Sequence, residues 1–407
     1  MGNKRKIIND PVFGFIHISD EFIYDIIQHP YFQRLTRIKQ LGLTHLVYPG
    51  GQHTRMSHSL GAMYLMNEAI TQLRSKGHEI TDAEAQAALI AILLHDLGHG
   101  PFSHVLEDTL VKNVAHEEIS LILMNKMNEE MNGKLDLAIS IFKNEYHKKF
   151  LHQLVSGQLD VDRLDYLRRD SFFTGVHEGN IGSARIIKML NLKDDRLVVE
   201  AKGIYSIENF LMARRLMYWQ VYLHKTALAA EKMLVNILKK AQMLALKGEN
   251  IFAAPALSYF LYNLVNENSF TQEKQTLKAF VELDDNDIWS ALKVWANHSD
   301  CILSLLSKNL LNRNLFQIEI SQHPFNEDFL KQKKNEFAQK YNLSPEDASF
   351  LMSSNEISTN MYNETDDSID ILYKDDTIKD IAEASDMLNI QLLSKNVKKY
   401  YFCFLRD

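Results

Sequence analysis

Apolar residues recur at helical spacing from about residue 20 to about residue 270, which predicts a largely helical region. The run AALIAILL (87–94) is apolar on every side and indicates the buried part of a helix. Thr81 and Glu84 precede it with the spacing of a capping box. We therefore expect a helix from Thr81 to about Leu97, with Gly98 as its stop. Further helices are predicted to begin near Met56 and to cover residues 158–170 and 205–247.

The pattern changes after about residue 270, where short runs of β-branched and aromatic residues mix with helical spacing. The sequence therefore predicts a mainly α fold with two regions, a helical core (1–270) and a smaller α+β C-terminal region (271–407). The individual elements expected are strands NLFQIEI (314–320) and KKYYFCFL (398–405), a helix over 326–341, a short hairpin DDRLVVEAKG (194–203), and an acidic exposed segment MYNETDDSIDILYKDDT (361–377).

Composition places the chain among ordinary soluble proteins. It has 407 residues, of which 46% are hydrophobic and 24% charged, enough for a substantial core. The net charge of −7 gives no global basic field, so binding to nucleic acid is not supported and an anionic ligand needs local basic residues. Cys301 and Cys403 form no CxxC pair, which suits a reducing cytosol. No signal sequence and no apolar run of membrane-spanning length is present, so we expect a cytoplasmic protein without a membrane segment.

Histidine is concentrated in one stretch: seven of the 16 histidines lie between residues 53 and 116. His58 stands at the start of one apolar-periodic helix, and the pair His95-Asp96 closes the next. A buried unpaired charge is costly, and a divalent cation would compensate it. A histidine, a His-Asp pair and a later aspartate make a mixed nitrogen and oxygen site with open positions, which suits Fe, Mn, Mg or Zn in an open rather than a structural site. A His-Asp dipeptide without these other residues would be weak evidence for a metal site.

The aspartate that completes this set can be chosen by helical geometry. In LDVDRLDYLRRD (159–170), Asp160 and Asp162 are two residues apart and point about 200° from each other on a helix, so both cannot face one ion. Asp162, Tyr166 and Asp170 share one face. Asp162 therefore heads a polar stripe along which a ligand could lie, whereas the alternative is a solvated charged helix.

Six blocks together resemble the HD-domain deoxynucleoside triphosphate triphosphohydrolases, a family of HD metal-dependent phosphohydrolases. The resemblance covers about residues 10–250 and implies an HD-domain helical fold, a homo-oligomer (dimer or tetramer) and hydrolysis of a deoxynucleoside triphosphate to a deoxynucleoside and inorganic triphosphate. The blocks are FQRLTRIKQLG (32–42), VYPGGQHTRMSHSLG (47–61), LLHDLGHGPFSH (93–104), AHEE (115–118), DVDRLDYLRRD (160–170) and QVYLHK (220–225).

The resemblance also implies a role for individual residues. The implied metal ligands are His58, His95, Asp96 and Asp162. The implied catalytic residues are His99, His104, Glu107, His116 and Glu117, with His104 as proton donor to the leaving 5′-oxygen. The implied substrate-binding residues are Arg55, Arg163, Arg214 and Tyr166 on the phosphates and Gln40, Asp170 and Tyr222 on the sugar.

Two other functions remain open from the sequence. An HD phosphodiesterase or nuclease acting on a cyclic nucleotide or RNA could use the same metal ligands. A nucleotide sensor could keep the metal for stability, but it would not need the retained histidines His99, His104 and His116. The sequence does not indicate which base is preferred.

Overall fold

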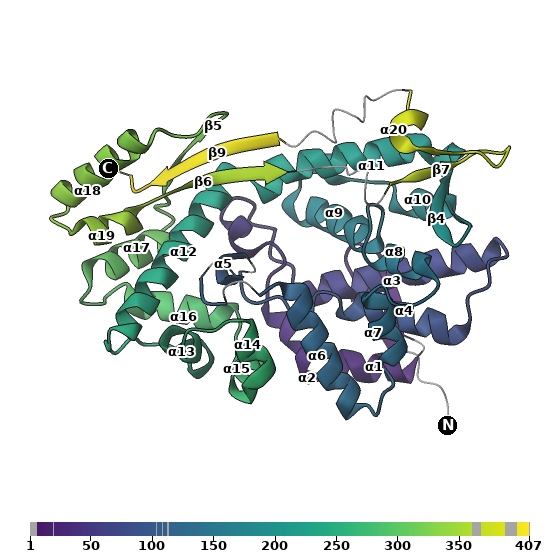
Figure 1. Cartoon of the computed structure of the whole chain (residues 1–407), viewed down its shortest axis with the longest axis horizontal. Coiled ribbons are helices and arrows are strands. Elements are labelled where there is room, and N and C mark those ends of the chain that lie inside the picture. The colour runs from purple at the N-terminus through teal and green to yellow at the C-terminus, as the bar shows by residue number, and fades with distance from the viewer. Residues whose placement is uncertain are drawn as a thin grey trace.

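The structure is a computed structural model that describes residues 6–18, 20–102, 104–107, 109–111, 114–359, 368–386 and 397–406, and of His104, Ser358 and Thr359 the backbone alone. Helices make up most of these residues, which confirms the predicted mainly α fold class (Figure 1). Among the described residues, no helix combines the length and the apolar character that crossing a membrane requires.

Three helices form the centre of the N-terminal part. Helix α3 (Arg55–Ser75) packs against α4 (Asp82–Leu94) and α9 (Val161–Thr174). The last turn of α4 is buried on all sides, as its apolar run predicts. Around them lie β1 (Lys6–Asp10), β2 (Gly14–Ile18), α1 (Glu21–Gln28), α2 (Pro30–Gln33), η1 (Arg34–Arg37), η2 (Gly42–Leu46), α5 (His104–Glu107), α6 (His116–Glu130), α7 (Asp136–Phe142) and α8 (Lys149–Val155).

The start of α4 is confirmed and its end is corrected. The Thr81 hydroxyl accepts a hydrogen bond from the Glu84 amide at 3.2 Å, and the Glu84 carboxylate accepts one from the Thr81 amide at 2.8 Å. The helix ends at Leu94 rather than Leu97. Gly98 does not act as a left-handed stop; it is required because a Cβ there would lie 2.0 Å from the His116 carbonyl oxygen.

The single helix predicted over 205–247 is wrong, because the chain breaks it into three pieces. Helix α11 (Ile204–Met217) runs into a π-helical turn, η5 (Tyr218–Tyr222), and α12 (Lys225–Leu246) begins after it, with His224 as N-cap. The Tyr48 hydroxyl donates to the Gln220 carbonyl oxygen at 2.7 Å and so satisfies one backbone group of the turn. A π-turn is a recurrent feature of functional sites.

The predicted hairpin is present but shifted. Its strands are β3 (Leu190–Lys193) and β4 (Arg196–Glu200), so Asp194 and Asp195 form the turn instead of beginning a strand. Both aspartates have positive φ, 50° and 61°. Two consecutive residues of this kind make the hairpin turn whose twist matches that of the strands. The neighbouring short elements are η3 (His177–Gly179), α10 (Ser183–Met189) and η4 (Ala201–Gly203).

The C-terminal region combines helices with two sheets, as its α+β character predicts. A three-stranded antiparallel sheet has the order β5-β9-β6 and runs along one edge of the molecule (Figure 1). The elements are α13 (Pro255–Tyr262), α14 (Glu267–Gln272), α15 (Lys274–Glu282), α16 (Asp285–Trp295), α17 (Cys301–Leu311), β5 (Gln317–Ser321), α18 (Glu327–Lys340), α19 (Pro345–Ala348), η6 (Ser349–Leu351), β6 (Met352–Thr359), β7 (Asp370–Leu372), β8 (Ile378–Asp380), α20 (Ile381–Ala384) and β9 (Val397–Phe404).

Strands β7 and β8 return to the N-terminal part. Strand β7 pairs in parallel with β4, which gives a four-stranded sheet of order β3-β4-β7-β8. Ile369 and Ile371 are 3% and 0% exposed, so the predicted exposure of 361–377 is wrong for this part, because alternate isoleucines face the core. Residues 361–367 lie outside the described residues. Helix α12 packs on α17 across the proposed boundary, and the division near residue 270 stays a prediction.

Candidate metal centre and its surroundings

Three helices bring three of the expected metal ligands together. His58 lies in the first turn of α3, His95 is the C-cap of α4, and Asp162 lies in the first turn of α9. Potential ligand atoms of these residues lie within 4.8 Å of one another. The Asp162 Oδ1 atom is 3.0 Å from His58 Nε2 and 3.5 Å from His95 Nε2. His58 and His95, which are 104 and 67 positions before Asp162 in the sequence, thus converge on a single carboxylate oxygen.

The donors fit a divalent cation. The Nε2 atoms of His58 and His95 are buried and make no hydrogen bond of acceptable geometry within the described part of the chain. Buried polar atoms are rarely left unsatisfied, and a cation held by two imidazole nitrogens and a carboxylate would satisfy them. Such a donor set leaves coordination positions open for water or substrate.

Asp96 lies at the edge of this group. Its Oδ1 atom is 3.3 Å from His95 Nε2, and its Oδ2 atom is 3.7 Å from His58 Nε2. The Oδ2 atom also accepts a hydrogen bond from Arg55 Nη1 at 2.5 Å. Burial raises the pKa of Asp96, but the charges of His95, His99 and Arg55 outweigh burial. The pKa of Asp96 is therefore well below its ordinary value. Asp96 is therefore ionised and adjacent to the three converging ligands, but Arg55 already holds one of its oxygens.

A buried chain of ion pairs fixes His58. Its Nδ1 atom lies 2.7 Å from Asp165 Oδ2, and Asp165 accepts hydrogen bonds from Arg169 at 2.9 and 3.0 Å. Arg169 also donates to Asp10 at 2.7 Å. A proton on Nδ1 leaves the Nε2 lone pair of His58 free to bind a metal. Gly61 makes room for the chain, since a Cβ there would lie 2.0 Å from Asp165 Oδ1.

These carboxylates also change the pKa values of the ligands. Burial lowers the pKa of His58, but hydrogen bonds and charges of Asp162 and Asp165 outweigh burial and raise it to about 10. Burial raises the pKa of Asp162, but the nearby imidazoles of His58 and His95 shift it below its ordinary value. A cation would take the place of the proton that the paired carboxylates attract to His58.

The predicted catalytic histidines form a second group beside Asp96. His99 Nε2 lies 3.3 Å from Asp96 Oδ1, and the rings of His99 and His116 stack with centroids 3.7 Å apart. His116 Nδ1 is 3.6 Å from Glu107 Oε1, and its Nε2 is 3.2 Å from Glu117 Oε1. The side chain of His104 lies outside the described residues. The structure therefore gathers four of the five predicted catalytic side chains and does not place the fifth.

This second group suits hydrogen bonding better than metal binding. Potential ligand atoms of Asp96, His99 and His116 lie within 4.8 Å of one another. The two imidazole planes are 18° apart, so their lone pairs point side by side and do not converge on one ion. Burial and the charge of Arg55 lower the pKa of His99 to about 3, which keeps this ring neutral near pH 7.

Arg34 supports the turn that carries these histidines, a role that no motif in the sequence predicts. Its side chain is fully buried, and Nη1 donates to the carbonyl oxygens of Leu97 and His99, both at 2.9 Å. Burial and the nearby Arg37 and Arg55 lower the pKa of Arg34 to about 9. A buried arginine at the end of a helix stabilises carbonyl groups that have no intrahelical partner.

Two of the predicted phosphate-binding arginines converge on one amide. Arg163 Nη1 lies 3.3 Å and Arg214 Nη1 3.1 Å from Gln158 Oε1, so a single neutral oxygen accepts from two guanidinium groups. Asp160 caps α9 and lies 3.1 Å from Arg163 Nε. The ring of Tyr166 is near both arginines, and burial raises its pKa to about 12.

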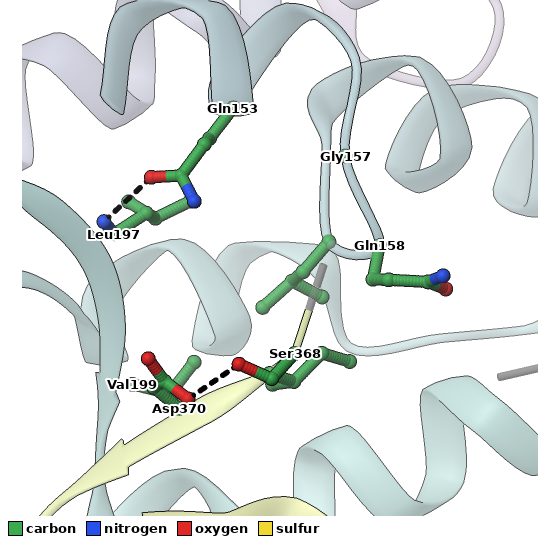
Figure 2. A pocket seen from close by; sticks show the side chains of 9 residues that line it. Gln153, Gly157, Gln158, Leu197, Val199, Ser368 and Asp370 are labelled. Carbon is green, nitrogen blue, oxygen red and sulfur yellow. Dashed lines mark hydrogen bonds between the residues drawn. The ribbon is translucent and has the colours of Figure 1, made fainter. Parts of the chain in front are cut away.

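The loop that carries Gln158 borders a small cavity. Figure 2 shows the Gln158 amide directed away from the other lining side chains, which come from α8, β4 and the segment that begins β7. The cavity measures about 20 Å³, which is room for about one water molecule and too little for a nucleotide. Residues 368–370 of the C-terminal region thus line the same cavity as the loop that carries Gln158.

The predicted sugar-binding residues lie at the other end of the α9 face. The Tyr222 hydroxyl donates to Asp170 Oδ2 at 2.7 Å, and the Tyr222 and Tyr166 rings are 6.0 Å apart. The backbone N–H of Gln40 donates a hydrogen bond to the backbone carbonyl oxygen of His53 at 3.0 Å. The stripe of Asp162, Tyr166 and Asp170 is therefore continuous and lined by polar partners.

Comparisons with known proteins agree with this arrangement. The HD domain profile matches residues 55–170, and a profile described as HD associated region matches residues 181–252. Protein YwfO of Bacillus subtilis is 36% identical over 77% of this chain and 72% of its own length. A solved phosphohydrolase from Bacteroides thetaiotaomicron is 65% identical, with a TM-score of 0.96 over 99% of this chain and 100% of the other.

The fold and the site thus define an HD-domain phosphohydrolase. A deoxynucleoside triphosphate triphosphohydrolase, the SAMHD1 homolog of Dictyostelium discoideum, is 31% identical over 58% of this chain, which spans 49% of that relative. The chain belongs to the HD-domain family that also contains these triphosphohydrolases.

Proposed function

We propose that this protein hydrolyses deoxynucleoside triphosphates to a deoxynucleoside and inorganic triphosphate. The observation that carries the proposal is the order of groups along one face of α9: candidate metal ligands at Asp162, arginines beside them, and a buried acid held by a tyrosine at Asp170. Asp162 would face the α-phosphate, the arginines would face the rest of the triphosphate, and Asp170 would face the sugar, which is attached to the α-phosphate through its 5′-oxygen. Relatives named as deoxynucleoside triphosphate triphosphohydrolases support the substrate class.

The phosphate chain would lie against the arginines. A triphosphate carries about four negative charges, for which guanidinium groups and a divalent cation are strong partners. Arg163 and Arg214 share one neutral acceptor, Gln158, and can donate to phosphate oxygens when a substrate arrives. Arg55, bound to Asp96, lies at the metal end of the same path.

The cation site comprises His58, His95 and Asp162, with Asp96 beside it. Of Fe, Mn, Mg and Zn, none is favoured by the donor types alone. A bound divalent cation would supply Lewis-acid polarisation of the α-phosphate and activation of a water molecule. Water attacks the α-phosphorus, the bond between this phosphorus and the 5′-oxygen breaks, and the departing 5′-oxygen takes up a proton.

Proton donation is assigned to the histidine group. A neutral His99 has one donor and one acceptor nitrogen, and the Glu107 carboxylate lies 3.6 Å from His116 Nδ1. His104 stays the predicted proton donor. A positioned general acid of this type contributes about 10²- to 10⁴-fold to a rate.

The test is to incubate purified protein with each dNTP and rNTP in Mn²⁺ or Mg²⁺ and to identify the products. Deoxynucleoside and tripolyphosphate from dNTPs support the proposal. Monophosphate and pyrophosphate would contradict it, and cleavage of a cyclic nucleotide or RNA alone would favour the phosphodiesterase alternative. The same preparation gives the oligomeric state by light scattering, for which a dimer or tetramer is our prediction.

A further inference from the structure

The sugar end of the site contains a buried histidine that the proposed function does not use. The side chain of His53 is 1% exposed, and its Nε2 atom lies 2.8 Å from Asp170 Oδ1. The other oxygen of Asp170 accepts from Tyr222. Asp170 itself is 2% exposed in its side chain. One histidine and one tyrosine therefore fix both oxygens of a buried carboxylate.

The position of Asp170 on α9 assigns Asp170, His53 and Tyr222 to the nucleoside part of the substrate. Asp170 lies two turns beyond Asp162, about 12 Å along the helix axis. If the phosphates lie against Arg163 and Arg214 near the metal end, the sugar reaches the Asp170 end of the stripe. Tyr166 lies between the two ends and faces Tyr222.

The proton on His53 can be placed by chemistry. A carboxylate only accepts hydrogen bonds, so Nε2 must carry the hydrogen. The Nδ1 atom is buried and has no hydrogen-bond partner among the described residues, and the same holds for Gln40 Oε1. A hydrogen bond from the backbone N–H of Gln40 to the backbone carbonyl oxygen of His53 connects the two residues. Buried polar atoms without a partner are uncommon, and a polar ligand would satisfy them.

A stacked ring holds His53 in this orientation. Its imidazole lies parallel to the ring of Phe173, with centroids 4.5 Å apart and planes 20° apart. Phe173 is on α9, three residues after Asp170. The imidazole is thus fixed by a ring contact and a hydrogen bond that both come from the last turns of α9.

We propose that His53 is the residue that positions Asp170 and Tyr222 for the sugar of the substrate, and that with Gln40 it forms the polar wall of the nucleoside subsite. This inference rests on the proposed function. It assigns His53 to recognition of the deoxynucleoside and not to metal binding or to contact with the phosphates.

The test compares His53→Leu with His53→Gln. Leucine removes the hydrogen bond to Asp170, whereas glutamine can place an N–H near the same point. We expect leucine to raise KM for dNTPs about 10- to 100-fold, the loss typical of a hydrogen bond to a charged group, with a smaller change in kcat. The preference for dNTP over rNTP should fall, and glutamine should restore part of both. His78→Leu, at a histidine bonded to Asn191, is the matched control.

Two further measurements separate this role from general damage. Metal content and inhibition by tripolyphosphate should stay at wild-type values in His53→Leu, because the hydrogen bond that is lost goes to Asp170 and not to a cation ligand or an arginine. An unchanged KM and sugar preference would overturn the inference, and so would an equal loss of tripolyphosphate binding.

The proposed function can fail separately. If wild-type protein hydrolyses no dNTP, the triphosphohydrolase assignment is wrong, and calorimetric binding of a deoxynucleoside to the wild type and to His53→Leu then decides the inference. Weaker binding to the variant supports it, and equal or absent binding to both overturns it.

Discussion

The two ends of the charged part of the site are held in opposite ways. At the metal end, His58 is fixed through Asp165, Arg169 and Asp10, and the side chains of this chain of contacts are 0% to 4% exposed. At the phosphate end, Arg163 and Arg214 share the oxygen of Gln158, and the Arg163 side chain is 23% exposed. Metal ligands need fixed geometry, whereas arginines that receive a substrate must be able to exchange partners.

Removing a ligand at the rigid end should have the largest effect. Asp162→Ala takes away the oxygen on which His58 and His95 converge. We expect loss of bound metal, measured by elemental analysis, and a fall in triphosphate release of at least about 10³-fold, in line with the loss of metal-supplied charge stabilisation.

Asp160→Asn is the matched control for that variant. Asparagine caps a helix as well as aspartate, and Asp160 is the N-cap of α9, so metal content should be retained. Normal metal content in Asp162→Ala would contradict the assigned site.

The next effect should come from the buried support of His58. Asp165→Asn weakens the pairing with Arg169 and the hold on the His58 tautomer. We expect metal affinity to fall about 10- to 100-fold and the free energy of unfolding to fall by up to about 3 kcal/mol, because the buried Arg169 loses one of its two charge partners and keeps Asp10. Metal titration and urea unfolding measure the two losses. Wild-type values for both would show that the rigid end does not depend on this chain of contacts.

A smaller effect is expected at the phosphate end. Gln158→Ala removes the amide that holds the two guanidinium groups, and KM for a dNTP should rise about 2- to 10-fold, the range of a neutral hydrogen bond. Metal content should not change, because the Gln158 oxygen accepts from Arg163 and Arg214. A loss of metal in this variant would erase the contrast between the two ends.

The smallest effect should come from a change at the N-terminus of α4, the end of the helix opposite to His95. Burial raises the pKa of Glu84, but the Thr81 amide, Tyr146 and Lys148 lower it to about 2. The ionised form thus stabilises the fold above about pH 4.5, and this contribution is lost as the pH falls towards 2. Glu84→Gln should lower the free energy of unfolding by about 1 kcal/mol at pH 7.

Measuring unfolding of both proteins from pH 7 down to pH 3 checks this sign. The difference between wild type and variant should shrink as the pH falls, while metal affinity stays the same in both at pH 7. A difference that grows towards low pH would contradict the lowered pKa.

The sequence by itself determined features that depend on local spacing, such as the start of α4 and the face of α9 that carries Asp162. Apolar spacing and the Thr81–Glu84 capping box predict α4, and helical geometry selects Asp162 over Asp160, which serves as the N-cap. Both inferences depend on residues within one or two turns of each other, for which spacing fixes direction.

Only the tertiary structure decided which distant groups meet. Asp165 reaches His58 across 107 positions, Asp170 reaches His53 across 117, and Arg169 reaches Asp10 across 159. The π-helical turn Tyr218–Tyr222 likewise receives a hydrogen bond at the Gln220 carbonyl oxygen from Tyr48, 172 positions away. Local periodicity contains no information on such contacts, because they arise when separate helices pack and buried charges and backbone groups must find partners.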